Sequence, residues 1–195
     1  MSWFRRLLQY ATNSEATISH SRSEQSRRAI PTVKFDPATV SQSVKANLRA
    51  NVESLDDVGK EHIRPVYEAA LGCVLAGGDL HVLSVALMKI EGMPKERVAE
   101  IARSLHSKAK AQIDRERQAS LGITHAKWMY SNAPCMRDPR RRTAANVQQD
   151  AAHRVANGER YEISKGLFVD GKLTWPGVEE GCKCSSRAIL PGLKE

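Results

Sequence analysis

The sequence predicts an α+β fold, in which an α-helical N-terminal region precedes a small C-terminal α+β module. Helix start and stop signals and one long amphipathic stretch occur before residue 122, whereas short apolar runs separated by turn residues follow it. A chain of 195 residues suits one domain or a small domain with extensions. We expect an arm over residues 1–34, a helical region over residues 35–122 and a compact module over residues 123–195.

Composition narrows the class of protein. The chain is 41% hydrophobic but only 5% aromatic, which allows a core with few large rings. It contains no run of 18 apolar residues, so no transmembrane helix is expected, and residues 1–10 lack the features of a secretory signal. The net charge of +8 favours a polyanionic partner such as nucleic acid.

The arm over residues 1–34 is polar and rich in serine and arginine. It carries a short apolar patch near its start, formed by Trp3, Phe4, Leu7, Leu8 and Tyr10. Two interpretations are open: a mobile tail, or an arm that docks on a partner through this patch.

Two helices are expected in the first part of the helical region. Asp36-Pro37 combines an N-cap residue with a proline at the first helical position, and predicts a helix to about residue 52. Ser54-x-x-Asp57 predicts the start of a second helix, which ends at Gly77-Gly78. Pro65 lies inside this helix and is expected to kink or split it.

Two more helices complete the helical region. Asp79 is a suitable N-cap for a short apolar helix over residues 80–90. Pro94 then begins the longest helix, and Gly122 follows its end as a C′ residue. Apolar residues of the long helix recur at i, i+3 and i+4 on one face, namely Val98, Ile101, Ala102, Leu105, Ala109 and Ile113.

The C-terminal module mixes short elements. A strand is expected over residues 125–131 with Trp128, followed by a basic irregular segment and a helix over residues 144–155. Asp170-Gly171 is typical of a tight hairpin turn. It joins the last two of the strands expected at residues 161–163, 167–169 and 173–175.

The four cysteines do not indicate a disulfide framework, because no secretion signal accompanies them. Cys73 lies in an apolar run and is interpreted as a small core residue. Cys182 and Cys184 form a Cys-x-Cys pair, which suits metal binding better than nucleophilic catalysis with His153. Phosphate-binding glycine loops, His-Glu-x-x-His and Gly-x-Ser-x-Gly are absent.

A basic cluster lies in the irregular segment before the helix at residues 144–155. Guanidinium groups bind phosphate through paired hydrogen bonds, so these residues are candidates for sequence-independent contacts with a nucleic-acid backbone. A solvated loop is the open alternative. The cluster consists of Arg137, Arg140, Arg141 and Arg142.

An ordered set of motifs runs through the second half of the chain. It begins with Ile101-Ala-Arg103, Asp114-Arg115-Glu-Arg117-Gln118, Leu121-Gly122-Ile123 and Trp128 with Ser131. It continues with His153-x-x-x-Asn157-Gly158-x-x-Tyr161-x-x-x-Lys165-Gly166, Asp170-Gly171, Trp175-Pro176-Gly177, Cys182-Lys183-Cys184 and Pro191-Gly192. The set resembles the phage Mu protein F-like minor head (head morphogenesis) family of tailed bacteriophages. It departs from the family pattern by an apparent insertion at residues 141–150.

The resemblance implies a structural virion protein rather than an enzyme. Members of the family associate with the portal inside the phage head and aid assembly or DNA delivery. The chain is therefore expected in multiple copies in the virion, at the head interior or portal vertex, and in the host cytoplasm during assembly. Its expected partners are the portal protein, the major capsid protein and phage DNA, without contact to a membrane.

The resemblance also suggests a metal site, because the His153 motif recurs in the family together with Cys-x-Cys. Cys135 lies in the irregular segment after Trp128 and completes a Cys₃His set with His153, Cys182 and Cys184. Such a set binds zinc without an open position and would stabilise a module with a thin core. We expect the four ligand atoms to converge within about 4 Å of one another.

Two other functions are open. Modules of this type also occur near bacterial toxin domains, so a small metal-containing nuclease is the second hypothesis. His125, His153 and the basic cluster would then supply its acid–base and phosphate-binding groups. The third hypothesis is a zinc-stabilised nucleic-acid-binding protein of a host.

Overall fold

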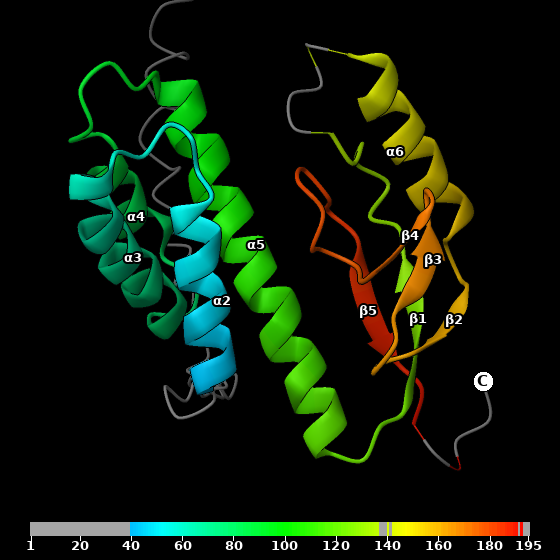
Figure 1. The fold of residues 1–195 in the computed structure, drawn as a ribbon. Helices are drawn as coiled ribbons and strands as arrows, with labels where there is room; N and C mark the ends of the chain where they lie inside the picture. Colours follow the sequence, from blue (N-terminus) through cyan, green and yellow to red (C-terminus); the bar gives the residue numbers. More distant parts are fainter. Residues whose placement is uncertain (1–39, 137–139, 141, 191, 193–195) are drawn as a thin grey trace, which may run out of the picture. The chain divides into compact units, whose positions relative to one another are not determined.

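The computed structural model describes residues 40–136, 140, 142–190 and 192. Every described residue belongs to one compact unit of the chain, Phe35–Glu195. The predicted arm, with its apolar patch, lies outside the described residues. The described elements confirm the α+β fold: helices come first, and short antiparallel strands follow (Figure 1).

Four helices form the first hydrophobic core. They are α2 (Gln42–Glu53), α3 (Lys60–Leu75), α4 (Leu80–Leu87) and α5 (Lys95–Ser120). The apolar face predicted for α5 is buried against the other three helices, and Cys73 is fully buried in the same core, as expected.

None of the described helices combines the length and the apolar character that crossing a membrane requires.

The helix boundaries differ from the predicted ones because other residues act as caps. α2 begins after Ser41, whose side chain accepts a hydrogen bond of 3.1 Å from the Val44 N–H, so Asp36 is not its N-cap. Ser54 ends α2 instead of starting α3: its hydroxyl donates to the Asn51 carbonyl at 2.9 Å. Gly59 is the N-cap of α3.

Two further helix predictions need adjustment. Pro65 lies inside α3 without splitting it, since the helix continues through sixteen residues and buries its apolar side chains after the proline. Asp79 caps α4 as predicted, accepting from the His81 N–H at 3.0 Å. α4 ends at Leu87 rather than Ile90, because the following residues form turns.

The end of α5 directs the chain into the second part of the unit. Gly122 has a φ of +73°, which favours glycine, and its N–H donates to the Ala119 carbonyl at 3.0 Å. The Ile123 N–H donates to the Gln118 carbonyl at 3.0 Å. These two bonds form a Schellman motif, and they place Ile123 in the second core.

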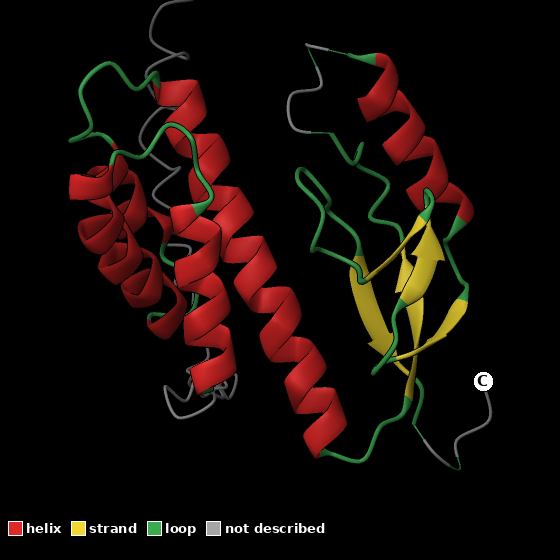
Figure 2. Ribbon diagram, viewed as in Figure 1, coloured by secondary structure: helices red, strands yellow, loops and turns green. Residues whose placement is uncertain are grey.

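A three-stranded antiparallel sheet forms the frame of the second core. β1 (His125–Met129) lies between β2 (Arg160–Glu162) and β5 (Ser185–Ala188), as Figure 2 shows. Trp128 on β1 is completely buried. The sequence analysis did not predict β5, because its sequence, Ser-Ser-Arg-Ala, has no alternation of large apolar and polar residues. Antiparallel pairing with β1 makes this segment a strand.

The hairpin and the last helix lie beside this sheet. β3 (Leu167–Val169) and β4 (Lys172–Thr174) pair through the predicted turn, in which Asp170 and Gly171 both have positive φ. α6 (Ala144–Val155) has the predicted bounds and covers most of the apparent insertion. Its Gln148 donates to the Asp170 carboxylate at 2.6 Å, which joins α6 to the hairpin turn.

Candidate metal centre

Four predicted ligands meet in one buried cluster, although they come from three separate segments. Cys135 lies in the loop after β1, His153 on α6, and Cys182 and Cys184 in the loop before β5. All four residues are less than a tenth exposed. One ligand atom from each lies within 4.8 Å of the other three.

The distances suit a tetrahedral metal ion. Zinc–sulfur bonds of about 2.3 Å place two tetrahedral sulfur ligands roughly 3.8 Å apart. The Sγ atoms of Cys135 and Cys184 are 3.4 Å apart, and the Cys184 Sγ is 3.9 Å from the His153 Nδ1. These pairs fall within the expected 4 Å, while the complete set extends to 4.8 Å. Four such donors can hold one metal ion.

Backbone amides orient two of the sulfur atoms. The Gly177 N–H donates to the Cys182 Sγ at 3.3 Å, and the Lys183 N–H donates to the Cys135 Sγ at 3.4 Å. Donors of this kind stabilise thiolates, the form in which cysteine binds a metal. The Cys-x-Cys turn therefore contributes two ligands and also orients the sulfur of a third.

Asp150 is a supporting residue that the sequence pattern did not single out. Its carboxylate accepts hydrogen bonds from the Cys135 N–H at 2.7 Å and the Tyr130 hydroxyl at 2.8 Å. It also pairs with Arg154 at 2.9 Å, and it is only 5% exposed. A usable signal was its spacing: Asp150 precedes His153 by three residues, so both lie on one face of α6.

The His-x-x-x-Asn-Gly motif fixes the end of α6 against β1. The Asn157 side chain accepts from the Tyr130 N–H at 2.9 Å, and the Gly158 N–H donates to the Trp128 carbonyl at 2.7 Å. The His153 ring then contacts Trp128 edge to face, with 5.2 Å between ring centroids. The motif thereby positions the imidazole inside the second core.

The four groups change one another's affinity for protons. Hydrogen bonds from Cys182 and Cys184 hold the pKa of the Cys135 thiol far below its usual range, whereas hydrogen bonds with Cys135 and Cys182 raise the pKa of Cys184. Burial opposes a charged imidazole, but hydrogen bonds and negative charge from Cys135 and Cys182 raise the pKa of His153 to about 9. A metal ion would displace these protons, because its ligands are thiolates and neutral imidazole.

The basic cluster can be placed only in part. Arg140 and Arg142 are exposed, and Arg142 precedes Thr143, the N-cap of α6. Arg137 and Arg141 lie outside the described residues. Contact of these arginines with nucleic acid stays a prediction.

Comparison with known proteins finds no matching family model, no matching curated protein and no matching solved structure. Membership of the phage minor head family therefore stays a prediction.

We expect Asp150→Asn to weaken metal binding by about 10- to 100-fold, because the orientation of Cys135 depends on the Asp150 carboxylate. The measurement is competition for zinc with a chromogenic chelator, using the full chain. Asp56→Asn is the matched control, since Asp56 is exposed and lies in the helical region. Equal zinc affinity of both variants would show that Asp150 does not support the cluster.

Proposed function

We propose that the Cys₃His cluster holds one zinc ion in a closed structural site. The donor set supports this proposal, because thiolate and imidazole are the ligands that structural zinc prefers. Burial of all four residues supports it as well, since buried thiols with no metal or disulfide partner contribute only small apolar contacts. Zinc would join the loop after β1, α6 and the loop before β5.

Wild-type protein purified without chelators is expected to contain one zinc per chain, and Cys135→Ser is expected to lose it, because a serine hydroxyl is a poor zinc ligand. Elemental analysis measures both. Cys73→Ser is the matched control: Cys73 is equally buried, but it lies in the helical core. This control should keep its zinc while its stability falls by about 1–3 kcal/mol because of the buried hydroxyl. Wild-type protein free of metal would contradict the proposal.

We further propose that the chain is a structural minor head protein of a tailed bacteriophage, bound to portal and capsid and in contact with phage DNA. One observation carries this proposal. The His-x-x-x-Asn-Gly and Cys-x-Cys motifs, which belong to the ordered set that carries the family resemblance, form one physical unit in this chain around the buried cluster. The net charge of +8 suits a compartment filled with DNA.

The alternative, a small metal-containing nuclease, has no specific observation in its favour. Catalytic zinc keeps a coordination position for water, whereas four protein ligands would fill a tetrahedral site. His153 would then be a ligand and could not act as a general base. We therefore retain the structural role as the proposed function.

The proposed role predicts that the protein is part of the particle. Virions produced from the genome that encodes the chain should contain it after gradient purification, together with the portal protein. Mass spectrometry of the purified particles measures this, with a soluble non-structural phage protein as the control for contamination. Virions that contain portal but lack this chain would refute the role.

DNA binding is expected to be independent of sequence and sensitive to salt. Replacing all four arginines of the basic cluster with alanine should lower the slope of log affinity against log salt by about 0.9 for each phosphate that the variant no longer neutralises. Fluorescence anisotropy with duplex DNA measures the slope. The control removes four exposed arginines elsewhere, Arg49, Arg64, Arg160 and Arg187. Equal slopes in the two variants would exclude this segment as the DNA-binding surface.

A further inference from the structure

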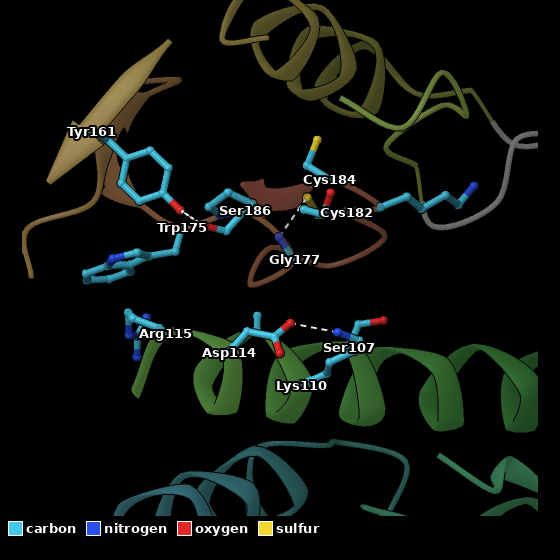
Figure 3. Close-up of a pocket in the computed structure, with 14 residues that line it drawn as sticks. Ser107, Lys110, Asp114, Arg115, Tyr161, Trp175, Gly177, Cys182, Cys184 and Ser186 are labelled. Carbon is cyan, nitrogen blue, oxygen red and sulfur yellow. Dashed lines mark hydrogen bonds and ion pairs between the residues drawn. The ribbon is translucent and has the colours of Figure 1, made fainter. Parts of the chain in front are cut away.

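A cavity of about 230 Å³ lies between α5 and the loops of the second core. The face of α5 that lines it is opposite the apolar face buried in the helical core, and it carries Ser107, Lys110, Asp114 and Arg115. In Figure 3, α5 lies below the cavity and the loop with Gly177 and Cys182 lies above it. At about 30 Å³ per water molecule, this space accommodates one phosphate group with several waters.

The two sides of the cavity, α5 and the loop that contains Gly177, lie close together at Gly177. This residue is buried and has a φ of +84°. A Cβ atom at its position would lie only 3.2 Å from the Cβ of Ala111 on α5. The cavity is thus bounded by a helix and by a loop whose neighbouring residues belong to the metal cluster.

Arg115 is the unusual side chain of this cavity. Its guanidinium lies 4.3 Å from the ring centroid of Trp175, and the Trp175 indole N–H donates to the Ile163 carbonyl at 2.8 Å. A cation–π contact uses the face of a guanidinium and leaves the N–H donors at its edge available to another partner. The Arg115 side chain is half-buried, and the charge of Glu116, its neighbour on α5, attracts it, but among the described residues no carboxylate forms an ion pair with Arg115.

The other charged groups of the cavity already have partners. Lys110 pairs with Asp114 at 2.6 Å, and the Lys183 ammonium donates to the Pro134 carbonyl at 2.9 Å. Among the neutral polar groups of the lining, the Tyr161 hydroxyl donates to the Ser186 Oγ at 2.6 Å. Three cations, one carboxylate and the two cysteines of the Cys-x-Cys pair line the cavity. Of the three cations, Arg115 is the one that no hydrogen bond or ion pair to a described residue engages.

We propose that this cavity binds a phosphate group, with the edge of the Arg115 guanidinium as the principal contact. Planar guanidinium groups bind phosphate through two parallel hydrogen bonds. The proposal deepens the proposed function and rests on it for the source of the phosphate, namely the backbone of phage DNA. A free phosphate ion offers the same chemistry.

The direct test is a titration of ¹⁵N-labelled full-length protein, with the Arg115 Nε–H and Trp175 Nε1–H resonances observed by NMR. Inorganic phosphate and a short DNA duplex should both shift these two resonances, whereas acetate should not. A response to acetate that equals the response to phosphate would indicate a carboxylate site and overturn the proposal. Absence of a shift with both inorganic phosphate and duplex DNA would also overturn it.

Variants of Arg115 and Arg117 distinguish a specific phosphate site from non-specific attraction between opposite charges. Arg115→Gln should weaken phosphate binding by about tenfold, which corresponds to about 1.4 kcal/mol for a charged hydrogen-bonded contact. Arg117→Gln is the matched control, because it removes the same charge from an exposed position two residues further along α5. Arg115→Lys keeps the charge but removes the paired donors, so it should also bind more weakly. Equal affinities of the Arg115 and Arg117 variants would refute the site.

The outcomes distinguish this site from the proposed function. If phosphate shifts the resonances but duplex DNA does not bind at any salt concentration, the phosphate site is supported and the proposed contact with DNA is refuted. If DNA binds equally well to wild type and to Arg115→Gln, the proposed contact with DNA is supported, and the cavity is excluded as the place where a DNA phosphate binds. Thermal denaturation and zinc content of each variant verify that the fold is retained.

Discussion

Three sulfur atoms and one imidazole converge at a buried point of the second core and bring three segments of the chain together. The strands of this core have only three to five residues each, and such short strands provide few ladder hydrogen bonds. The ligand atoms connect segments that the sheet alone does not hold together, because the three cysteines lie in two loops and the histidine lies on α6. Asp150 and the amides of Gly177 and Lys183 extend this constraint from the ligands to the backbone.

Helix α5 links this cluster to the rest of the unit by having two different faces. One face buries aliphatic side chains in the helical core. The opposite face carries small and charged residues, and the close approach of Gly177 to Ala111 is possible because neither residue has a long side chain. Cys182 and Cys184 line the same cavity as Arg115, so the loop that supplies two ligands also forms a wall of the cavity.

The elements that could be predicted are those with local physical signals. The periodic apolar face of α5, the Asp79 cap and the Asp170-Gly171 turn each depend on neighbouring residues, and the structure has them as expected. β5 could not be predicted in the same way, because pairing with a distant strand defines it. The start of α2 was misplaced because the sequence offers two N-cap residue types, Asp36 and Ser41, and Ser41 is the one that caps α2. Asp150 was missed because its partner, the Cys135 amide, is fifteen residues away.

The order of the ligands along the chain has a consequence for synthesis in the cell. Cys135 and Cys184 are 49 residues apart. A ribosome that adds 5–20 residues per second needs roughly 2 to 10 seconds to cover this distance. During that interval the nascent chain carries Cys135 without the complete cluster, and its thiol can be oxidised or can bind a metal ion without the other three residues. Helices α2 to α5 precede Cys135 in the chain and are synthesised before this interval begins, so the delay concerns the second core alone.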